Sequence, residues 1–222
     1  MKKVLLCLLC VCCFLTACGT SQETIPTTQA VTETTVPVPL TVSPLPVSID
    51  MAHLDNCTIA VSMEEGGAYV DDEGLMQMDV TVYAYDLYDL VDISRLKAGD
   101  TMILRQEPVL IETIEESSYG SILINGGLDL GGYELVTGED TVYYETGYSD
   151  VKSWYALGNA TIRVSPDFVY TDRSDLDQDP ILYYPGDFLI PDTGIDYDFT
   201  PHNCTITIQD GLAISMEKIY TP

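Results

Sequence analysis

The sequence has few basic residues: Lys and Arg number 9 in 222 residues against 35 Asp and Glu, and the formal net charge is −26. A chain this acidic repels phosphate groups, so nucleic acid and electrostatic adsorption to anionic membranes are excluded as partners. Hydrophobic residues still make up 46% of the chain, which is enough to build a core. The acidity therefore belongs to the surface of a folded protein.

Helical periodicity and long hydrophobic runs are also missing. No segment approaches 18 consecutive apolar residues, and no stretch of ten or more has a convincing helical period with caps. The best helical candidate is 86–96. Alternating apolar and polar residues dominate instead, most clearly at 76–85. Short runs of this kind, separated by Gly-containing turns, predict an all-β fold, a barrel or sandwich of short antiparallel strands.

The first eighteen residues have the features of an export signal. Two lysines precede an apolar run of twelve residues, which is too short to span a bilayer as a helix. The segment ends Leu-Thr-Ala-Cys18 and resembles the bacterial lipobox, in which a cysteine after small residues is acylated with palmitate-type chains and becomes the mature N-terminus. The resemblance implies a signal peptide at 1–17, a lipidated Cys18, and an extracytoplasmic protein held on the bacterial cell membrane by this anchor.

Residues 18–47 are rich in Thr, Pro, Val, Ser and Gln and contain no aromatic residue. Such a stretch buries too little surface to offset its ordering entropy, so it is predicted to be a disordered tether. The alternative is that it packs on the domain through Thr41-Val42 or 47–49. Residues 48–222 are predicted to form a single acidic all-β domain.

Two cysteines remain once the signal and Cys18 are set aside. Cys57 and Cys204 both lie in the context Asn-Cys-Thr-Ile, near opposite ends of the domain. Because exported compartments permit disulfides, the repeat predicts two neighbouring strands bridged by these cysteines. Two free thiols are one alternative, and a zinc site that adds His53 and His202 is another.

Acidic residues alternate at Asp175, Asp177 and Asp179. Calcium binds carboxylate oxygens in loops that begin Asp-x-Asp-x-Asp, so these three residues are a candidate calcium site. Pro180 stands where an EF-hand loop has glycine, and the twelfth position, Gly186, offers no carboxylate. A solvated acidic loop is the alternative, and no other cofactor is indicated.

The sequence contains no recognisable catalytic arrangement. The only two histidines flank the cysteine segments, and the motifs of serine hydrolases, zinc proteases, phosphate-binding loops and dinucleotide sites are missing. The pattern therefore favours a protein without enzymatic activity, with no catalytic residue predicted. An extracytoplasmic hydrolase that uses carboxylate or metal chemistry is the alternative.

Aromatic residues favour a binding function. The chain has 15 Tyr and a single Trp, and aromatic rings with polar groups suit stacking on sugars and contact with peptides, although tyrosine is also a common strand residue. The adjacent aromatic pairs are Tyr143-Tyr144, Trp154-Tyr155 and Tyr183-Tyr184. We predict a domain that binds a glycan, a peptide or an envelope protein, and a purely structural envelope domain is a further alternative. A lipobox followed by short strands and Gly-Gly turns is similar to uncharacterised exported lipoproteins of Gram-positive bacteria.

Overall fold

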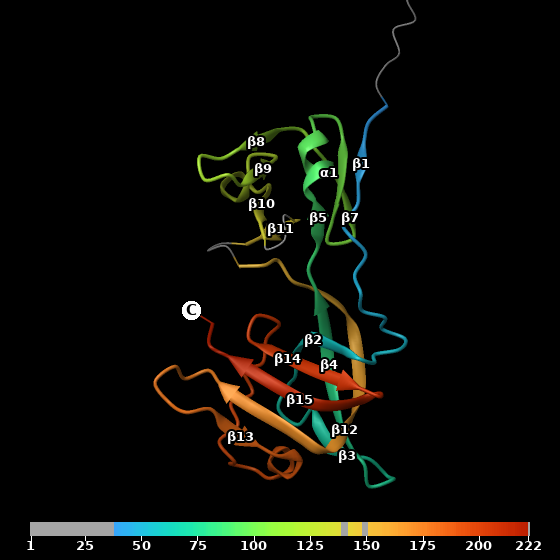
Figure 1. Cartoon of the computed structure of the whole chain (residues 1–222), viewed down its shortest axis with the longest axis vertical. Helices are drawn as coiled ribbons and strands as arrows, with labels where there is room; N and C mark the ends of the chain where they lie inside the picture. Colours follow the sequence, from blue (N-terminus) through green and yellow to red (C-terminus); the bar gives the residue numbers. More distant parts are fainter. Residues whose placement is uncertain (1–37, 139–141, 148–150, 222) are drawn as a thin grey trace, which may run out of the picture. The chain divides into compact units, whose positions relative to one another are not determined.

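Strands make up most of the regular structure, and α1 (Leu90–Arg95) is the one α-helix within the described residues (Figure 1). The structure is a computed structural model that describes residues 38–138, 142–147 and 151–221. The all-β prediction is confirmed. The predicted signal segment 1–17 and the lipidation residue Cys18 lie outside the described residues.

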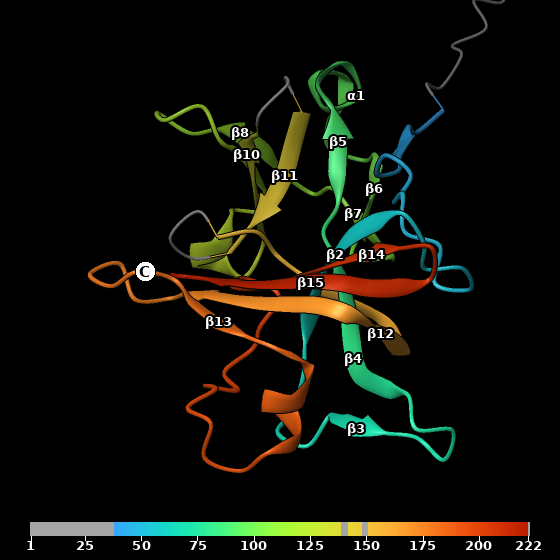
Figure 2. The ribbon, with the colours of Figure 1, turned by 60° about the horizontal axis from the view of Figure 1, so that its bottom comes forward.

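Five strands close into a barrel. They are β2 (Cys57–Ser62), β4 (Met76–Ala84), β12 (Tyr155–Arg173), β14 (Cys204–Gln209) and β15 (Leu212–Ile219). β2 pairs with β4, β4 with β12, β12 with β15, β15 with β14, and β14 with β2, which completes the ring (Figure 2). Only the β12–β15 pair of this ring is parallel. This strand order is that of the Greek-key barrel known as the OB-fold.

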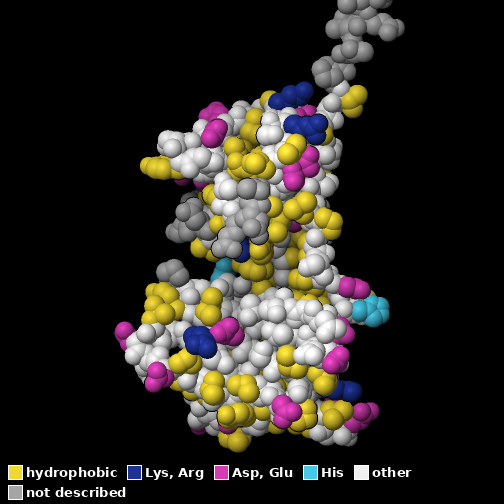
Figure 3. Space-filling model, viewed as in Figure 1, with side chains coloured by type: hydrophobic (Ala, Val, Ile, Leu, Met, Phe, Trp, Pro, Cys, Tyr) yellow, Lys and Arg dark blue, Asp and Glu magenta, His cyan; other side chains and the backbone are white. Residues whose placement is uncertain are grey.

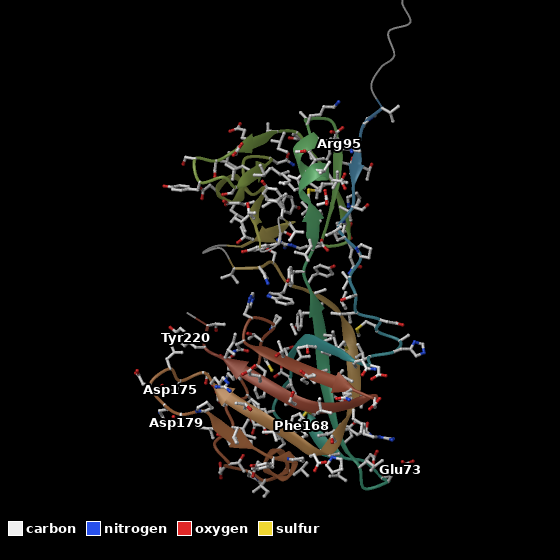
Figure 4. All side chains as sticks on the ribbon, in the orientation of Figure 1. Glu73, Arg95, Phe168, Asp175, Asp179 and Tyr220 are labelled. Atoms are coloured by element: carbon white, nitrogen blue, oxygen red, sulfur yellow. The ribbon has the colours of Figure 1, made fainter. Side chains whose placement is uncertain are left out.

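The barrel forms because its strands have one apolar face. In β4, Met78, Val80 and Val82 are buried, while the residues between them point outward. The interior is filled by these side chains together with Phe168 and Tyr170 of β12, which are fully buried; Phe168 is labelled in Figure 4. Each large apolar side chain removed from water contributes about 1.5–3 kcal/mol.

Two short strands extend the barrel sheet at its edges. β3 (Ala68–Val70) pairs with β4, and β13 (Ile181–Tyr183) pairs with β12. After β13, the 3-10 helix η4 (Pro185–Leu189) places Phe188 against Tyr170, with ring centroids 5.7 Å apart. The segment after β13 therefore closes one end of the barrel with aromatic side chains.

The chain between β4 and β12 forms further strands with a hydrophobic core of their own. They are β5 (Leu87–Asp89), β6 (Thr101–Leu104), β7 (Glu107–Leu110), β8 (Ile114–Glu116), β9 (Ile122–Ile124), β10 (Tyr133–Thr137) and β11 (Val142–Thr146), with the 3-10 helix η1 (Leu128–Leu130). β5, β11, β10, β9 and β8 make one sheet, and β6 pairs with β7. Their buried core includes Tyr88, Met102 and Leu135.

Helix α1 is shorter than the sequence pattern suggests. We expected helix over 86–96, but residues 87–89 form β5, whose Tyr88 is fully buried. The Asp89 carboxylate then accepts a hydrogen bond of 2.7 Å from the Val91 amide and starts the helix. The apolar residues expected on one helix face therefore belong partly to a strand and partly to a short helix.

The folded part begins earlier than residue 48. β1 (Thr41–Val42) pairs in parallel with β6. Val42 is 3% exposed and belongs to the hydrophobic core formed by the segment between β4 and β12. The Leu40 amide donates to the carboxylate of buried Asp100 at 2.8 Å, and the Thr101 amide donates to the Leu40 carbonyl at 2.9 Å. The described end of the predicted tether is thus packed on the protein, as the alternative for Thr41-Val42 anticipated.

A buried carboxylate joins the barrel to the segment between β4 and β12. Asp86 follows β4 and accepts hydrogen bonds from the Arg105 amide at 2.7 Å, the Tyr155 hydroxyl at 2.8 Å and the Tyr88 hydroxyl at 3.2 Å. Arg105 in turn forms an ion pair with buried Glu145. Burial, together with the Asp86 charge, raises the pKa of Tyr155 and of Tyr88, so both hydroxyls remain protonated donors.

The molecular surface carries the charge expected from composition. Acidic side chains are spread over the face shown in Figure 3, with few basic side chains among them. Within the described residues, no helix is long and apolar enough to span a membrane.

Candidate functional site

A polar groove of about 440 Å³ lies on the outer face of β4 and β12. Its volume is in the range of small-ligand pockets. The polar side chains that line it are Ser62, Glu64, Asp79, Thr81, Asn159 and Thr161. These residues come from three barrel strands, β2, β4 and β12, and from the turn after β2.

Strand alternation and one irregularity place these polar groups together. Asp79 and Thr81 occupy the outward positions of β4. In β12 the register shifts between Ala156 and Gly158, where glycine adopts φ +155°. Such a bulge changes which residues face outward, so that Asn159 is paired with Thr81 on the groove side.

Hydrogen bonds hold the groove side chains in place. The Thr161 hydroxyl donates to Asp79 at 2.6 Å, and the Thr81 hydroxyl donates to the Asn159 carbonyl oxygen at 3.0 Å. The Tyr69 hydroxyl also reaches Asp79, at 3.4 Å. One Asp79 oxygen and the Asn159 amide nitrogen have no bond among the described residues. The groove therefore offers acceptors and donors whose positions are set before a ligand arrives.

The charge of the groove favours ligands without phosphate. Its lining contains two carboxylates, Glu64 and Asp79, and no basic side chain among the described lining residues. Arg163 is the nearest basic residue along β12, and it is paired in the sheet with Gln77. The local charge therefore has the same sign as the whole chain.

The two residues of the aromatic pair Trp154-Tyr155 have different roles. Tyr155 donates to buried Asp86, so it fixes the start of β12 against the end of β4. Trp154 packs edge-on against Tyr85, with ring centroids 4.8 Å apart. Of the other aromatic pairs, Tyr183 packs on the barrel core, where its ring stacks on Tyr170 at 5.3 Å.

The predicted disulfide is wrong. β2 and β14 are neighbours, as the repeated Asn-Cys-Thr-Ile context indicated, but Cys57 is paired with Ile208, and both cysteines are free. The antiparallel register leaves Cys204 four residues beyond this pair. Four strand residues span about 13 Å, whereas a disulfide requires Cα atoms within about 7 Å. Burial raises the pKa of Cys204 to about 12 and also raises that of Cys57, so both remain thiols near neutral pH.

The zinc alternative is not supported by the arrangement of its four residues. His53 is exposed and contacts Asp50 at 3.3 Å, while the His202 ring lies 6.5 Å from the Trp154 ring. Among residues 38–138, 142–147 and 151–221, no three His, Cys, Asp or Glu side chains are grouped to hold a metal ion.

The calcium candidates Asp175, Asp177 and Asp179 lie in the loop between β12 and β13 (Figure 4). The Asp175 carboxylate accepts hydrogen bonds from the Asp177 amide at 2.9 Å and from the Gln178 side chain at 2.5 Å. All three aspartates are exposed. Asp175 therefore organises the turn, and the three carboxylates are not gathered around one point in this conformation.

The groove residues were not identified as a site from sequence. Asp79 and Thr81 were recognised only as the polar face of a strand, and Asn159 and Thr161 lie about eighty residues further along the chain. The one available signal was the alternation in 76–85, which indicates the side chains that point outward but not the residues that they contact.

No protein-family model, no curated protein and no solved structure matches this chain.

Proposed function

We propose that this protein binds a neutral oligosaccharide in the β4–β12 groove. The supporting observation is the preset row of hydroxyl, amide and carboxylate groups formed by Asp79, Thr81, Asn159 and Thr161. Sugar hydroxyls donate and accept hydrogen bonds together, so they match a surface that offers both kinds of group.

Electrostatics distinguish between the two ligand classes of OB-folds, which are oligonucleotides and oligosaccharides. A nucleic-acid site gains most of its affinity from Lys and Arg contacts with phosphate. The groove has Glu64 and Asp79 in place of such residues, on a chain with a net charge of −26. A neutral sugar does not suffer this repulsion.

We further propose that binding takes place outside the cytoplasm, on a protein anchored through acylated Cys18. The lipobox supports this anchor, and two acyl chains hold a protein durably at a bilayer. The acidic surface keeps the domain away from anionic headgroups, so the ligand would be encountered in the envelope or beyond it. Mass spectrometry of the membrane-extracted protein tests the anchor: an unmodified Cys18 in an intact N-terminal peptide would contradict it.

The binding proposal is tested by calorimetric titration with neutral oligosaccharides of two to six residues, built from glucose, galactose or N-acetylglucosamine. Asp79→Asn keeps the shape of the side chain but removes the charged acceptor, and should weaken binding about tenfold, since hydrogen bonds to charged groups contribute about 1.5–3 kcal/mol. Asp129→Asn is the matched control, because exposed Asp129 lies in η1 and does not line the groove.

Two results would contradict the proposal. One is the absence of heat with every oligosaccharide, and the other is equal weakening by Asp79→Asn and Asp129→Asn. The reaction mixtures are also analysed for shortened sugars, because cleavage would favour the hydrolase alternative with Glu64 and Asp79 as the carboxylates in contact with the ligand.

A further inference from the structure

A second cavity, of about 270 Å³, lies beside the groove over the outer faces of β2 and β4. Its aromatic lining is Tyr83, Tyr85 and Trp154, and one wall is the chain segment 45–49, which precedes the barrel. We call it the aromatic pocket. All three aromatic residues are half-buried and line the cavity.

The aromatic rings are held by contacts on several sides. Trp154 packs edge-on against Tyr85 at 4.8 Å and against His202 at 6.5 Å. The Lys152 ammonium lies 4.2 Å from the Tyr85 ring centroid and donates to the Tyr85 hydroxyl at 3.1 Å. Tyr85 directly precedes buried Asp86, and Trp154 directly precedes Tyr155, so the Asp86–Tyr155 hydrogen bond also holds the backbone segments that carry these two rings. Such fixed aromatic groups lose little entropy when a ligand binds.

The pocket continues the groove. Ser62 lines the groove, Tyr83 lines the pocket, and their hydroxyls share a hydrogen bond of 3.1 Å. Tyr83 lies on the same outer face of β4 as Asp79 and Thr81, four residues from Asp79. Four strand residues span about 13 Å, which a chain of a few sugar rings also spans.

We propose that the aromatic pocket is a subsite for one further ring of the oligosaccharide that occupies the groove. This inference rests on the proposed function of the groove. The apolar face of a sugar ring packs on aromatic side chains, while its edge hydroxyls reach polar groups. The pocket provides both, because Ser48, Thr58 and the Tyr83 hydroxyl lie in the same lining as the three rings.

Binding of a ligand in the aromatic pocket can be measured by tryptophan fluorescence. The chain has one tryptophan, so its fluorescence reports on Trp154 alone. The purified full chain is titrated with neutral oligosaccharides of two to six residues, while calorimetry measures total binding and acrylamide quenching measures access to Trp154. Hexasaccharides should bind about tenfold more tightly than disaccharides and should protect Trp154 from quenching. Disaccharides confined to the groove should leave it unprotected.

Substitutions separate the subsite from the groove. Tyr85→Ala removes one wall of the pocket and should weaken hexasaccharide binding about tenfold while leaving disaccharide binding unchanged, since truncation of a central aromatic contact costs more than about 1 kcal/mol. Asp79→Asn should weaken both. Tyr119→Ala is the control, because Tyr119 is 95% exposed and lies outside both cavities. Circular dichroism confirms that each variant is folded.

The outcomes are distinguishable. Hexasaccharide binding that depends on Asp79 but neither protects Trp154 nor responds to Tyr85→Ala overturns the subsite and leaves the proposed function intact. Binding of no oligosaccharide overturns both. Protection of Trp154 by aromatic peptides such as Gly-Tyr-Gly, with no protection by sugars, also overturns the subsite and indicates a peptide pocket.

Discussion

Lys218 and Asp196 form an ion pair in which the lysine is buried and the aspartate is largely exposed. Lys218 lies on β15 with its side chain 3% exposed, whereas the Asp196 side chain is 67% exposed. The ammonium donates to the Asp196 carboxylate at 2.8 Å and to the Asp196 carbonyl at 3.2 Å, and it lies 5.5 Å from the Phe199 ring centroid. The two partners should therefore respond differently to removal.

Asp196→Asn should cost more stability than Lys218→Met. The first substitution leaves a buried ammonium with only neutral acceptors, which we expect to cost about 2 kcal/mol, below the 3–5 kcal/mol typical of fully buried pairs. The second leaves a carboxylate that water already reaches and puts a flexible apolar side chain beside Phe199. It should change the free energy of unfolding by less than about 1 kcal/mol.

Urea unfolding at pH 7 measures the difference. With a slope of about 2 kcal/mol/M, Asp196→Asn should lower the midpoint by about 1 M without changing the slope, and Lys218→Met should leave it nearly in place. The reasoning would be refuted if Lys218→Met lost as much unfolding free energy as Asp196→Asn, or more. Such a result would mean that the attraction between the two charges, and not the cost of an unpaired buried ammonium, sets the stability.

The same pair contributes a pH dependence. The Lys218 hydrogen bond lowers the pKa of Asp196 below its usual 3.8. Because the folded pKa is the lower one, the contribution is complete above the unfolded pKa and is lost as the pH falls through the folded value. Stability should therefore decrease below about pH 4 in the parent chain, and this decrease should be smaller in Lys218→Met.

Two further outcomes are expected, and a third measurement tests the calcium hypothesis. Thiol reagents at neutral pH should modify half-buried Cys57 slowly and Cys204 only after unfolding, and a mass increase of two hydrogens on reduction would contradict the free thiols. Val42→Ala should lower the unfolding free energy by about 1–2 kcal/mol in urea, whereas an unchanged value would mean that β1 does not contribute to the core. The calcium hypothesis requires that millimolar calcium raise the melting temperature and that Asp175→Asn abolish the rise, and a flat response would exclude it.

Much of the fold could be predicted because barrel strands alternate. The strand at 76–85 was predicted to within one residue of β4, since each second side chain enters the core. β12 was not, because only 160–164 alternate clearly while the strand continues through Pro166 to Arg173 with a register shift after Val164. Bulges interrupt the period of two, and sequence patterns do not show where a partner strand tolerates them.

The site was less predictable because it depends on pairing between distant segments. The repeated Asn-Cys-Thr-Ile context indicated the correct neighbours, β2 and β14, but not the register, and the register decides whether Cys57 meets Cys204. The contact between Asp79 and Thr161 likewise depends on the bulge at Gly158. Trp154 could be singled out in the sequence because it is the only tryptophan. Its ring contact with Tyr85 is evident only from the structure.

The parallel pairing of β1 with β6 would have a mechanical consequence if the protein were held through the anchor proposed at Cys18. Within the described residues, a pull from that side would reach Leu40 before the barrel, and two hydrogen bonds join Leu40 to Asp100 and Thr101. Residues 45–49, which follow β1 after two residues, form a wall of the aromatic pocket. Tension would therefore act on β1 and on this wall before any strand of the barrel carried load, and retention of the proposed ligand would then depend on force.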